Sequence, residues 1–283
     1  MLAYADGEGG GDAMRRAVAV RDMVAGKEIL RIPVSREEMV HRLVVAPDGR
    51  HLAATFAPAG SVPSAEGPAV QVRDLRKGRK LRELPGDYGH GAFSPDGRTL
   101  VTTTGYAVDL ASGSVREDVL GAGRTTDLVF SPDGEQVAVL KESGLVELWD
   151  GAVRERRATM PSSLVRGGDR HGGFARAMAF SADGGSLALL LDADPGRLDG
   201  DAVQLRDTAA RLPLDPPLVL GGRPADAVAF HGQSLRTLTG DQVRTIDLTP
   251  AELTKTVCRR AGRGLTEEEW RTYIPDEPYR ELC

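Results

Sequence analysis

Four aspartates crowd one segment of the sequence and could bind a hard cation such as calcium, because carboxylate oxygens are its preferred ligands. They are Asp192, Asp194, Asp199 and Asp201. Their spacing differs from that of an EF-hand loop, since Gly196 stands at the fifth position and no glutamate closes the loop. We therefore expect a solvated acidic loop, and we assign no metal ligands.

A glycine-rich run at residues 7–12 invites comparison with a phosphate-binding loop. It lacks the Lys and Ser/Thr that such a loop needs, and a strand pattern rather than a helix follows it. No Gly-x-Ser-x-Gly or His-Glu-x-x-His motif occurs. The histidines fall at predicted strand starts and turns of different repeats, not in a common layer; they are His41, His51, His90, His171 and His231. We therefore assign no catalytic residue and no cofactor, and we expect that the protein is not an enzyme.

The bulk composition bears on the class of partner. The 283 residues carry a net charge of −5, with 36 basic and 41 acidic residues interspersed, whereas a nucleic-acid binder normally presents a basic face. The longest apolar run, residues 187–191, is far shorter than the roughly 20 residues that a membrane-spanning helix needs. Acidic residues occupy the N-terminus where a signal peptide has an apolar stretch. We expect a soluble, cytoplasmic protein that binds neither nucleic acid nor membranes.

The elements that must position any site repeat along the chain. One phrase is an apolar strand, a Pro-Asp-Gly-type turn and a second apolar strand, in which Pro presets φ, Asp bonds back to the backbone and Gly supplies a positive φ. A second phrase is an alternating strand that ends in aspartate. Six copies of a unit that cannot bury its own faces must stack on one another. The turns lie at residues 47–49, 95–97, 132–134 and 182–184, with a worn copy at 230–232, and the aspartates are Asp22, Asp74, Asp109, Asp150, Asp207 and Asp247.

This unit resembles the WD40 repeat, and the resemblance covers residues 1–249. Leu148-Trp149-Asp150 is the only intact copy of the name-giving Trp-Asp dipeptide, so the repeats are degenerate. The aspartates are separated by 35 to 57 residues, around the 40–45 of a WD40 blade. The resemblance implies an all-β fold, namely a WD40-like β-propeller of about six degenerate blades that binds protein partners.

Both ends of the repeat array are incomplete. With strands a to d counted outward from the axis, residues 2–5, 17–21 and 28–32 are predicted to be strands b, c and d of a first blade without a strand a. The last blade has a, b and c at residues 226–230, 235–239 and 243–248, and then turns helical without a strand d. Three outcomes are open: a six-bladed ring with a repaired seam, an open ring, or an upstream polypeptide that completes the propeller.

The long connections are all predicted to lie on one face. In a WD40 propeller the b–c and d–a connections share a face, and residues 6–16, 56–69, 159–174 and 192–202 all belong to these two classes. Binding residues concentrate on long loops of a rigid scaffold, although repeat folds also tolerate neutral insertions. We predict binding on this face, with the candidate residues Arg166, Arg170, His171, Asp194 and Arg197.

From residue 250 the period becomes helical, which predicts a two-helix tail, residues 250–283, docked on the propeller of residues 1–249. Thr249 is the expected N-cap of the first helix, with Pro250 at its first position. Thr266 and Glu269 form a capping box before the second helix. The apolar face of that helix is predicted to consist of Trp270, Tyr273 and Ile274.

The tail resembles the C-terminal signature of WD40 regions in actinobacterial STAND NTPase and Ser/Thr kinase signalling proteins. The resemblance implies a non-catalytic scaffold or sensor in a bacterial signalling or defence assembly, with an NTPase or kinase polypeptide as partner. The chain departs from that family in having no Walker loop and no kinase signature. The alternative is a TolB-like envelope propeller or a propeller hydrolase or lactonase. The matching residues are Cys258, Arg259, Gly262, Leu265, Thr266, Glu269, Trp270, Tyr273, Pro275, Pro278, Tyr279, Arg280 and Cys283.

The only two cysteines, Cys258 and Cys283, both lie in the tail. A reducing cytosol would keep them as thiols, whereas pairing would close a loop of about 25 residues. Both states are open from the sequence.

Overall fold

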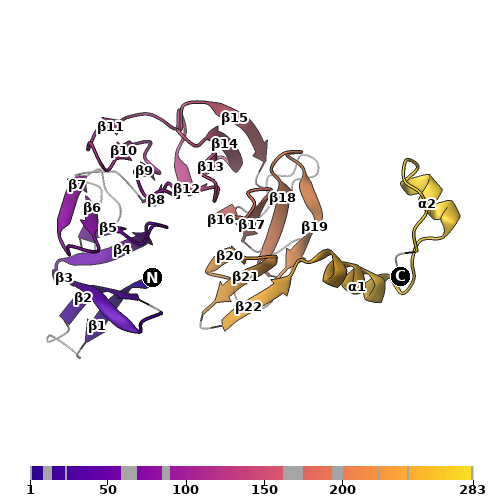
Figure 1. The fold of residues 1–283 in the computed structure, drawn as a ribbon, viewed down its shortest axis with the longest axis horizontal. Helices are drawn as coiled ribbons and strands as arrows, with labels where there is room; N and C mark the ends of the chain where they lie inside the picture. Colours follow the sequence, from indigo (N-terminus) through magenta and orange to yellow (C-terminus); the bar gives the residue numbers. More distant parts are fainter. Residues whose placement is uncertain are drawn as a thin grey trace.

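Six antiparallel sheets follow one another along the chain before residue 250. The computed structural model describes residues 2–8, 15–22, 24–58, 69–84, 90–161, 175–192, 200–221, 224–240, 242–281 and 283. Within these residues, four sheets have four strands each, and the first and last sheets have three. Figure 1 shows the six sheets side by side along an arc.

Each sheet is formed by strands that are consecutive in the sequence. The first sheet is β1 (Leu2–Glu8), β2 (Arg15–Asp22) and β3 (Lys27–Val34), and the second is β4 (Glu38–Val45), β5 (His51–Pro58), β6 (Ala69–Asp74) and β7 (Lys80–Leu84). The third is β8 (Gly91–Phe93), β9 (Thr99–Thr102), β10 (Ala107–Asp109) and β11 (Val115–Arg116), and the fourth is β12 (Thr125–Phe130), β13 (Gln136–Lys141), β14 (Leu145–Asp150) and β15 (Arg156–Pro161). The fifth is β16 (Ala175–Phe180), β17 (Ser186–Leu191), β18 (Ala202–Asp207) and β19 (Pro213–Val219), and the sixth is β20 (Ala227–His231), β21 (Ser234–Thr239) and β22 (Gln242–Asp247).

The sheets are arranged radially around a common axis. The inner strand of each complete sheet packs beside the inner strand of the next, so that β4, β8, β12, β16 and β20 line the axis in that order. All six predicted aspartates are the last residues of their strands, namely of β2, β6, β10, β14, β18 and β22. The predicted all-β, WD40-like propeller architecture is confirmed.

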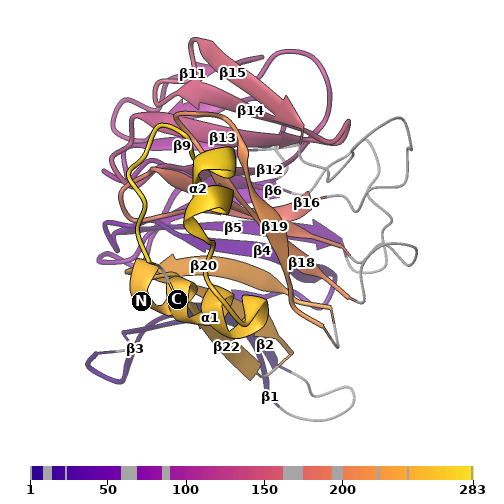
Figure 2. The same ribbon diagram turned by 90° about the vertical axis from the view of Figure 1, so that its right-hand side faces the viewer.

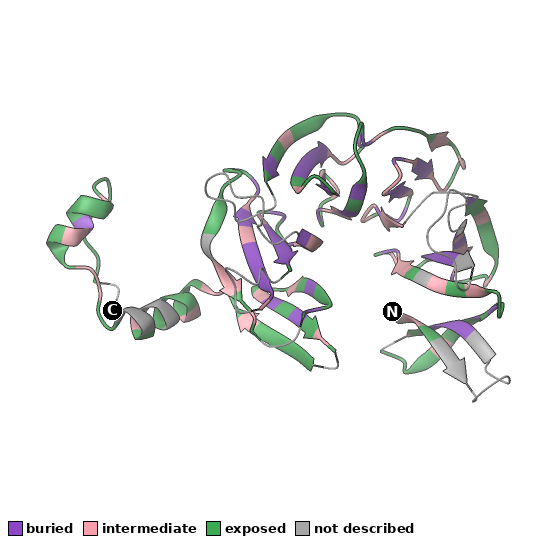
Figure 3. Cartoon of the chain, turned by 180° about the vertical axis from the view of Figure 1, so that it is seen from behind, coloured by how far each residue is buried: buried purple, intermediate pink, exposed green. Residues whose placement is uncertain are grey.

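Apolar packing between neighbouring sheets supplies the core. Five clusters of buried residues occupy the five interfaces between consecutive sheets, and Figure 3 shows buried residues gathered in the middle of the sheets, with exposed ones along the outer strands. At the interface of the fourth and fifth sheets, for example, Leu140 and Val146 pack against Leu187, Leu189 and Leu191, all at most 1% exposed. Because a strand directs alternate residues to its two faces, each of the four middle sheets is apolar on both sides and packs against two neighbours.

The Pro-Asp-Gly-type turns form as predicted. In the turn of the fourth sheet, the Asp133 carboxylate accepts a hydrogen bond from the backbone N–H of Glu135 at 3.0 Å and another from the Ser131 hydroxyl at 2.6 Å. Gly134 has a φ of 77°, which favours glycine. The same arrangement recurs around Asp96 and Asp183.

The ring is open between the first and last sheets. In the described residues β1 pairs only with β2 and β22 pairs only with β21, and Figure 1 places these two sheets at opposite ends of the arc. The predicted shortage of one strand at each end is therefore confirmed. In the described residues the ring is open, and its completion by another polypeptide stays a prediction.

Two helices follow the last sheet, as predicted. They are α1 (Pro250–Ala261) and α2 (Glu267–Tyr273), and the capping box of Thr266 and Glu269 is formed. Thr249 is the N-cap of α1 but makes no side-chain capping bond. Both helices lead away from β22 in Figure 1, and Figure 2, seen from that side, draws them in front of the sheets. Leu253 is 41% exposed. Docking of the tail on the propeller is not seen here and stays a prediction.

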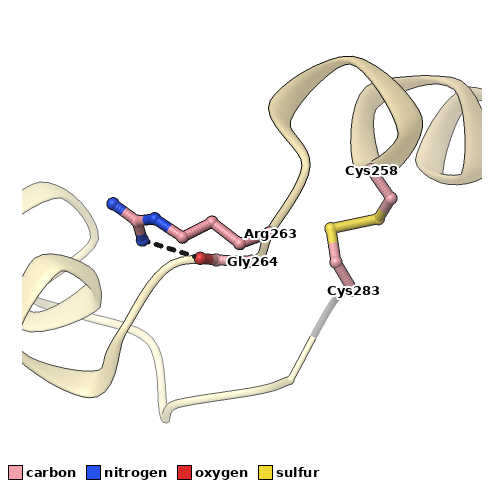
Figure 4. The surroundings of a disulfide bond; sticks show 4 residues. All are labelled: Cys258, Arg263, Gly264 and Cys283. Carbon is pink, nitrogen blue, oxygen red and sulfur yellow. Dashed lines mark hydrogen bonds between the residues drawn. A yellow bond between two sulfur atoms is a disulfide. The ribbon is translucent and has the colours of Figure 1, made fainter.

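The tail is held by contacts within itself. A disulfide joins Cys258 of α1 to Cys283, drawn in Figure 4. The Trp270 indole is 6% exposed, lies edge-on to Tyr279 and donates to the Glu277 carbonyl at 2.8 Å. Tyr273 is 73% exposed, so it does not share the buried face expected for it.

Candidate functional site

The five residues predicted for binding lie outside the described residues. Arg166, Arg170 and His171 belong to the connection between β15 and β16, and Asp194 and Arg197 belong to that between β17 and β18. They stay predictions. The strands that flank these connections are described, and they fix the face from which each connection starts and ends.

All four long connections start and end on the same face of the propeller. The paired strand ends beside them are Glu8 with Arg15, Phe56 with Ala69, and Leu191 with Ala202. Ala175, where the fourth connection ends, pairs with Leu191 and so shares this end of its sheet. We call this side, where the inner strands begin, the long-loop face.

A cavity of about 380 Å³ opens on the long-loop face between the fourth and fifth sheets. The turn between β13 and β14 contributes Glu142 and Gly144, and Lys141 is the last residue of β13. The beginnings of the two inner strands contribute the other lining residues, Thr126, Ala175 and Arg176.

Bulges in the inner strands give the cavity its lining. The register of β12 against β13 skips Thr126, and the register of β16 against β17 skips Arg176. A third bulge lies at His41 in β4, the same position of the repeat. A bulge re-aims a side chain and often lies beside a functional site. The bulges are not predictable from the sequence, because the strand pattern continues through each of them without a glycine or proline to mark it.

Lys141 anchors the neighbouring connection and is not available to a ligand. Its ammonium donates to the carbonyls of Leu120 at 2.9 Å and Gly123 at 3.3 Å, and it lies 3.8 Å from a Glu147 carboxylate oxygen. Burial lowers the pKa of the Lys141 ammonium, and the negative charge of Glu147 opposes that shift. Glu147 also accepts from the Trp149 indole at 3.0 Å, which ties the intact Trp-Asp sequence into the same network.

Arg176 joins the fifth sheet to the sixth. Its guanidinium donates to the Asp201 carboxylate and to the Ala225 carbonyl, and its Nε lies 2.9 Å from an Asp192 oxygen. Asp201 in turn accepts from the backbone N–H of Ala225 at 2.7 Å. The carboxylates of Asp192 and Asp201 are therefore bound to the guanidinium of Arg176. Among the described residues, no group of three or more His, Cys, Asp and Glu side chains could hold a metal ion.

A second polar cluster lies at the axis and draws on four inner segments. The Asp127 carboxylate, 6% exposed, accepts from the backbone N–H of Met178 at 3.2 Å and from the Arg42 guanidinium at 3.5 Å. His90 Nε2 lies 3.7 Å from the same carboxylate. His90, which directly precedes β8, thus lies beside β12, and the prediction that the histidines share no common layer stays untested.

The described residues contain no helix long and apolar enough to cross a lipid bilayer; the longer of the two, α1, has 12 residues.

The comparisons with known proteins bear on the fold. No protein-family model matches the sequence, and no curated protein matches it. Among solved structures, a chain of a mitotic checkpoint complex is similar with a TM-score of 0.61 and 15% identity, over 84% of this chain and 70% of that chain. A chain of Kuenenia stuttgartiensis hydrazine synthase is similar with a TM-score of 0.55 and 17% identity, over 74% of this chain and 63% of that chain.

These neighbours differ in what their names describe, one being part of a protein complex and the other an enzyme. At such low identity the likeness concerns the fold alone, since one fold hosts many functions. Together with the radial sheets, it shows that the chain is a WD40-like β-propeller, with a ring open between the first and last sheets.

Proposed function

We propose that the chain is a non-catalytic protein-interaction module, acting as a scaffold or sensor in a cytoplasmic bacterial signalling or defence assembly. The observation that carries the proposal is that all four long connections and the cavity share the long-loop face. The sheets beneath are held by five apolar clusters, so the face is presented by a rigid support. A neighbour that belongs to a checkpoint complex is in keeping with such a role.

The partner proposed is a polypeptide that bears an NTPase or kinase domain. The support for it is the resemblance of the tail to actinobacterial signalling proteins, on the residues from Cys258 to Cys283. Arg166, Arg170, His171, Asp194 and Arg197 are its proposed contacts.

The test compares two pairs of arginine substitutions in affinity purification from the native host, followed by identification of the bound polypeptides. The first variant carries Arg166→Ala and Arg170→Ala. The matched control carries Arg98→Ala and Arg154→Ala, at exposed turns on the opposite face. We expect wild type and control to retain a polypeptide with an NTPase or kinase domain, and the first variant to lose at least tenfold of it. Equal recovery from both variants would show that the binding face is wrong, and absence of such a polypeptide would reject this class of partner.

A second candidate function, a TolB-like or hydrolytic propeller, is favoured by the axial cluster of Arg42, His90 and Asp127. A histidine beside a buried carboxylate is an arrangement that general-base catalysis uses. Turnover of ester or lactone substrates by wild type, abolished in His90→Ala, would favour this function over the first.

A further inference from the structure

The open seam of the ring has an edge and a face whose counterparts in other sheets are covered. Each sheet has one strand that ends in aspartate, and the position four residues before this aspartate is valine in five of the six sheets. In four of them this valine pairs with an apolar residue of the outer strand and is at most 2% exposed; the pairs are Val18 with Ile32, Val70 with Leu84, Val146 with Met160, and Val203 with Leu218. In the last sheet the same residue, Val243, is 63% exposed and has no outer strand beside it in the described residues.

The second strand of the last sheet, β21, shows the same difference in exposure from its counterparts in other sheets. Leu140 and Leu190, which pair with Val146 and Val203, are 1% and 0% exposed and belong to interfaces with the next sheet. Leu238 pairs with Val243 in the same way but is 37% exposed. The last sheet thus presents, toward the opening in Figure 1, the face that other sheets bury. An apolar sheet face beside an unpaired strand edge is a ready template for another polypeptide.

The order of strands in the repeat indicates which kind of segment could pair with the strands at the seam. Along the chain, the outer strand of each sheet is followed directly by the inner strand of the next, as in β3 to β4 and β15 to β16. The two unpaired edges at the seam are the outer edge of β22 and the inner edge of β1. An outer strand on β22 and an inner strand on β1 are therefore consecutive in the repeat, so one continuous two-strand segment can supply both.

Charge adds a second requirement. Arg236, on the seam face of β21, is exposed where the equivalent strands of other sheets carry the buried alanines Ala53, Ala138 and Ala188. An acidic side chain on the incoming segment or beside it would complement this charge.

We infer that the seam is a docking site for a two-strand segment of a partner polypeptide, which adds one strand antiparallel to β22 and the next to β1. Its first strand carries Ile, Leu or Met opposite Val243, and an acidic group faces Arg236. The inference deepens the proposed function, on which it rests in taking the chain to be a protein-binding module. Strand addition obtains affinity from backbone hydrogen bonds and specificity from alternate side chains.

A peptide copied from the chain itself is the probe. It comprises residues 27–45, an outer strand followed by an inner strand, with Ile32 as the residue to face Val243. Two shorter peptides, residues 27–34 and 38–45, carry one strand each. Binding is measured by fluorescence anisotropy, and the site is mapped by hydrogen exchange of the β1 and β22 amides.

We expect the long peptide to bind at least tenfold more tightly than either short one, because its second strand binds at a high effective concentration once the first is seated. Val243→Asp in the protein, or Ile32→Asp in the peptide, should weaken binding at least tenfold. Val24→Asp is the matched control, since Val24 is 100% exposed and lies in the turn between β2 and β3, not in a strand at the seam. Equal binding of long and short peptides, or an unchanged affinity of Val243→Asp, would overturn the inference.

Sedimentation of the protein alone excludes the other occupant. A dimer that Val243→Asp dissociates and Val24→Asp does not would assign the seam to a second copy of the chain and overturn the proposal. Peptide binding without any NTPase- or kinase-bearing partner would leave the seam established and reject the proposed partner. Suppose instead that the partner is lost only from the Arg166→Ala, Arg170→Ala variant and that no peptide binds. The proposed partner would then be supported, and docking at the seam would be rejected.

Discussion

Asp127 is the residue on which most inner segments converge. Its buried carboxylate contacts β4 through Arg42, β16 through the backbone of Met178, and the start of β8 through His90. A carboxylate that accepts several hydrogen bonds in a buried site links elements that share no backbone pairing. At the residue scale, this cluster gives the open arc a polar link across its axis.

Asp127→Asn should therefore destabilise the propeller while keeping its shape. The amide cannot accept from the Arg42 guanidinium and the Met178 backbone with the strength of a carboxylate, and bonds to a charged group contribute about 1.5–3 kcal/mol each. We expect the free energy of unfolding, measured with urea at pH 7, to fall by about 1–3 kcal/mol. Asp118→Asn, at an exposed connection, is the control and should lie within about 0.5 kcal/mol of wild type. Equal effects of the two would contradict the linking role.

Substitution of Ser131 should likewise destabilise one of the turns. Its buried hydroxyl donates to Asp133 at 2.6 Å and accepts from the backbone N–H of Gln136 at 2.9 Å. Ser131→Ala should lower the free energy of unfolding by about 1 kcal/mol. The same change should raise the pKa of Asp133, because the Ser131 hydroxyl is the largest cause that holds it below its ordinary value. Ser143→Ala, at an exposed turn, should change neither quantity, and a Asp133 pKa unaffected by Ser131→Ala, followed by NMR titration, would count against the argument.

Residues of the turns were predictable from sequence, and those of the axis were not. The Ser-Pro-Asp-Gly sequence predicts its turn because every hydrogen bond that stabilises the turn joins residues at most five positions apart. Asp127 and Arg42 are 85 residues apart, so no local pattern marks their contact. The same applies to Arg176 and Ala225, which only the packing of two sheets brings together.

At the scale of elements, strands ending in aspartate are confirmed in all six sheets. Period-two alternation and terminal turns predict them because both are local. The bulges at His41, Thr126 and Arg176 were not predicted, because no glycine or proline marks them in the sequence. The lining of the cavity therefore could not be predicted.

The helical tail yields an element-scale prediction about the disulfide. Closing a loop between residues 258 and 283, 25 positions apart, is worth about 3.5 kcal/mol in the chain-entropy treatment. Cys258→Ser with Cys283→Ser should lower the stability of the tail by up to that amount, seen as faster amide exchange in α2 and a fluorescence change at Trp270 in a Trp149→Phe background.

The same variant tests whether the tail docks on the sheets. With α1 and α2 leading away from β22, the urea midpoint of the propeller should stay the same. Wild type treated with reductant is the control, and it should reproduce the double variant. A propeller midpoint that fell together with the tail would show that the helices do pack on the sheets, as the sequence predicts.

At the scale of the whole molecule, apolar packing at five similar interfaces stabilises the fold, and in the described residues no such interface joins the first sheet to the last. Each cluster joins only neighbouring sheets, so the fold is held by nearest-neighbour contacts. The sequence predicts which strands the first and last sheets lack, because the strands of each repeat unit can be counted and compared. It could not predict whether the ring closes, because closure depends on small rotations summed over every interface.

The acid sensitivity of the molecule follows from its turns. Among the described residues, eight aspartates have a pKa below the ordinary value, largely through hydrogen bonds of turns and strand ends; they are Asp22, Asp74, Asp96, Asp109, Asp133, Asp150, Asp183 and Asp247. A carboxyl whose pKa is lowered by folding binds fewer protons in the folded than in the unfolded state. Its contribution is present above the unfolded pKa and is lost as pH falls through the folded one.

The melting temperature should therefore be nearly constant from pH 6 to 8 and fall by several degrees between pH 5 and pH 2.5, measured by circular dichroism. Because hydrogen bonds rather than distant charges cause most of these shifts, 0.5 M salt should change the profile little. A variant with Ser94→Ala, Ser131→Ala and Ser181→Ala should melt lower at pH 7 but lose less on acidification, since three of the eight carboxyls then titrate closer to their unfolded values. A parallel fall in both proteins would mean that the turn aspartates do not carry the effect, and that acid opens the sheets through groups elsewhere.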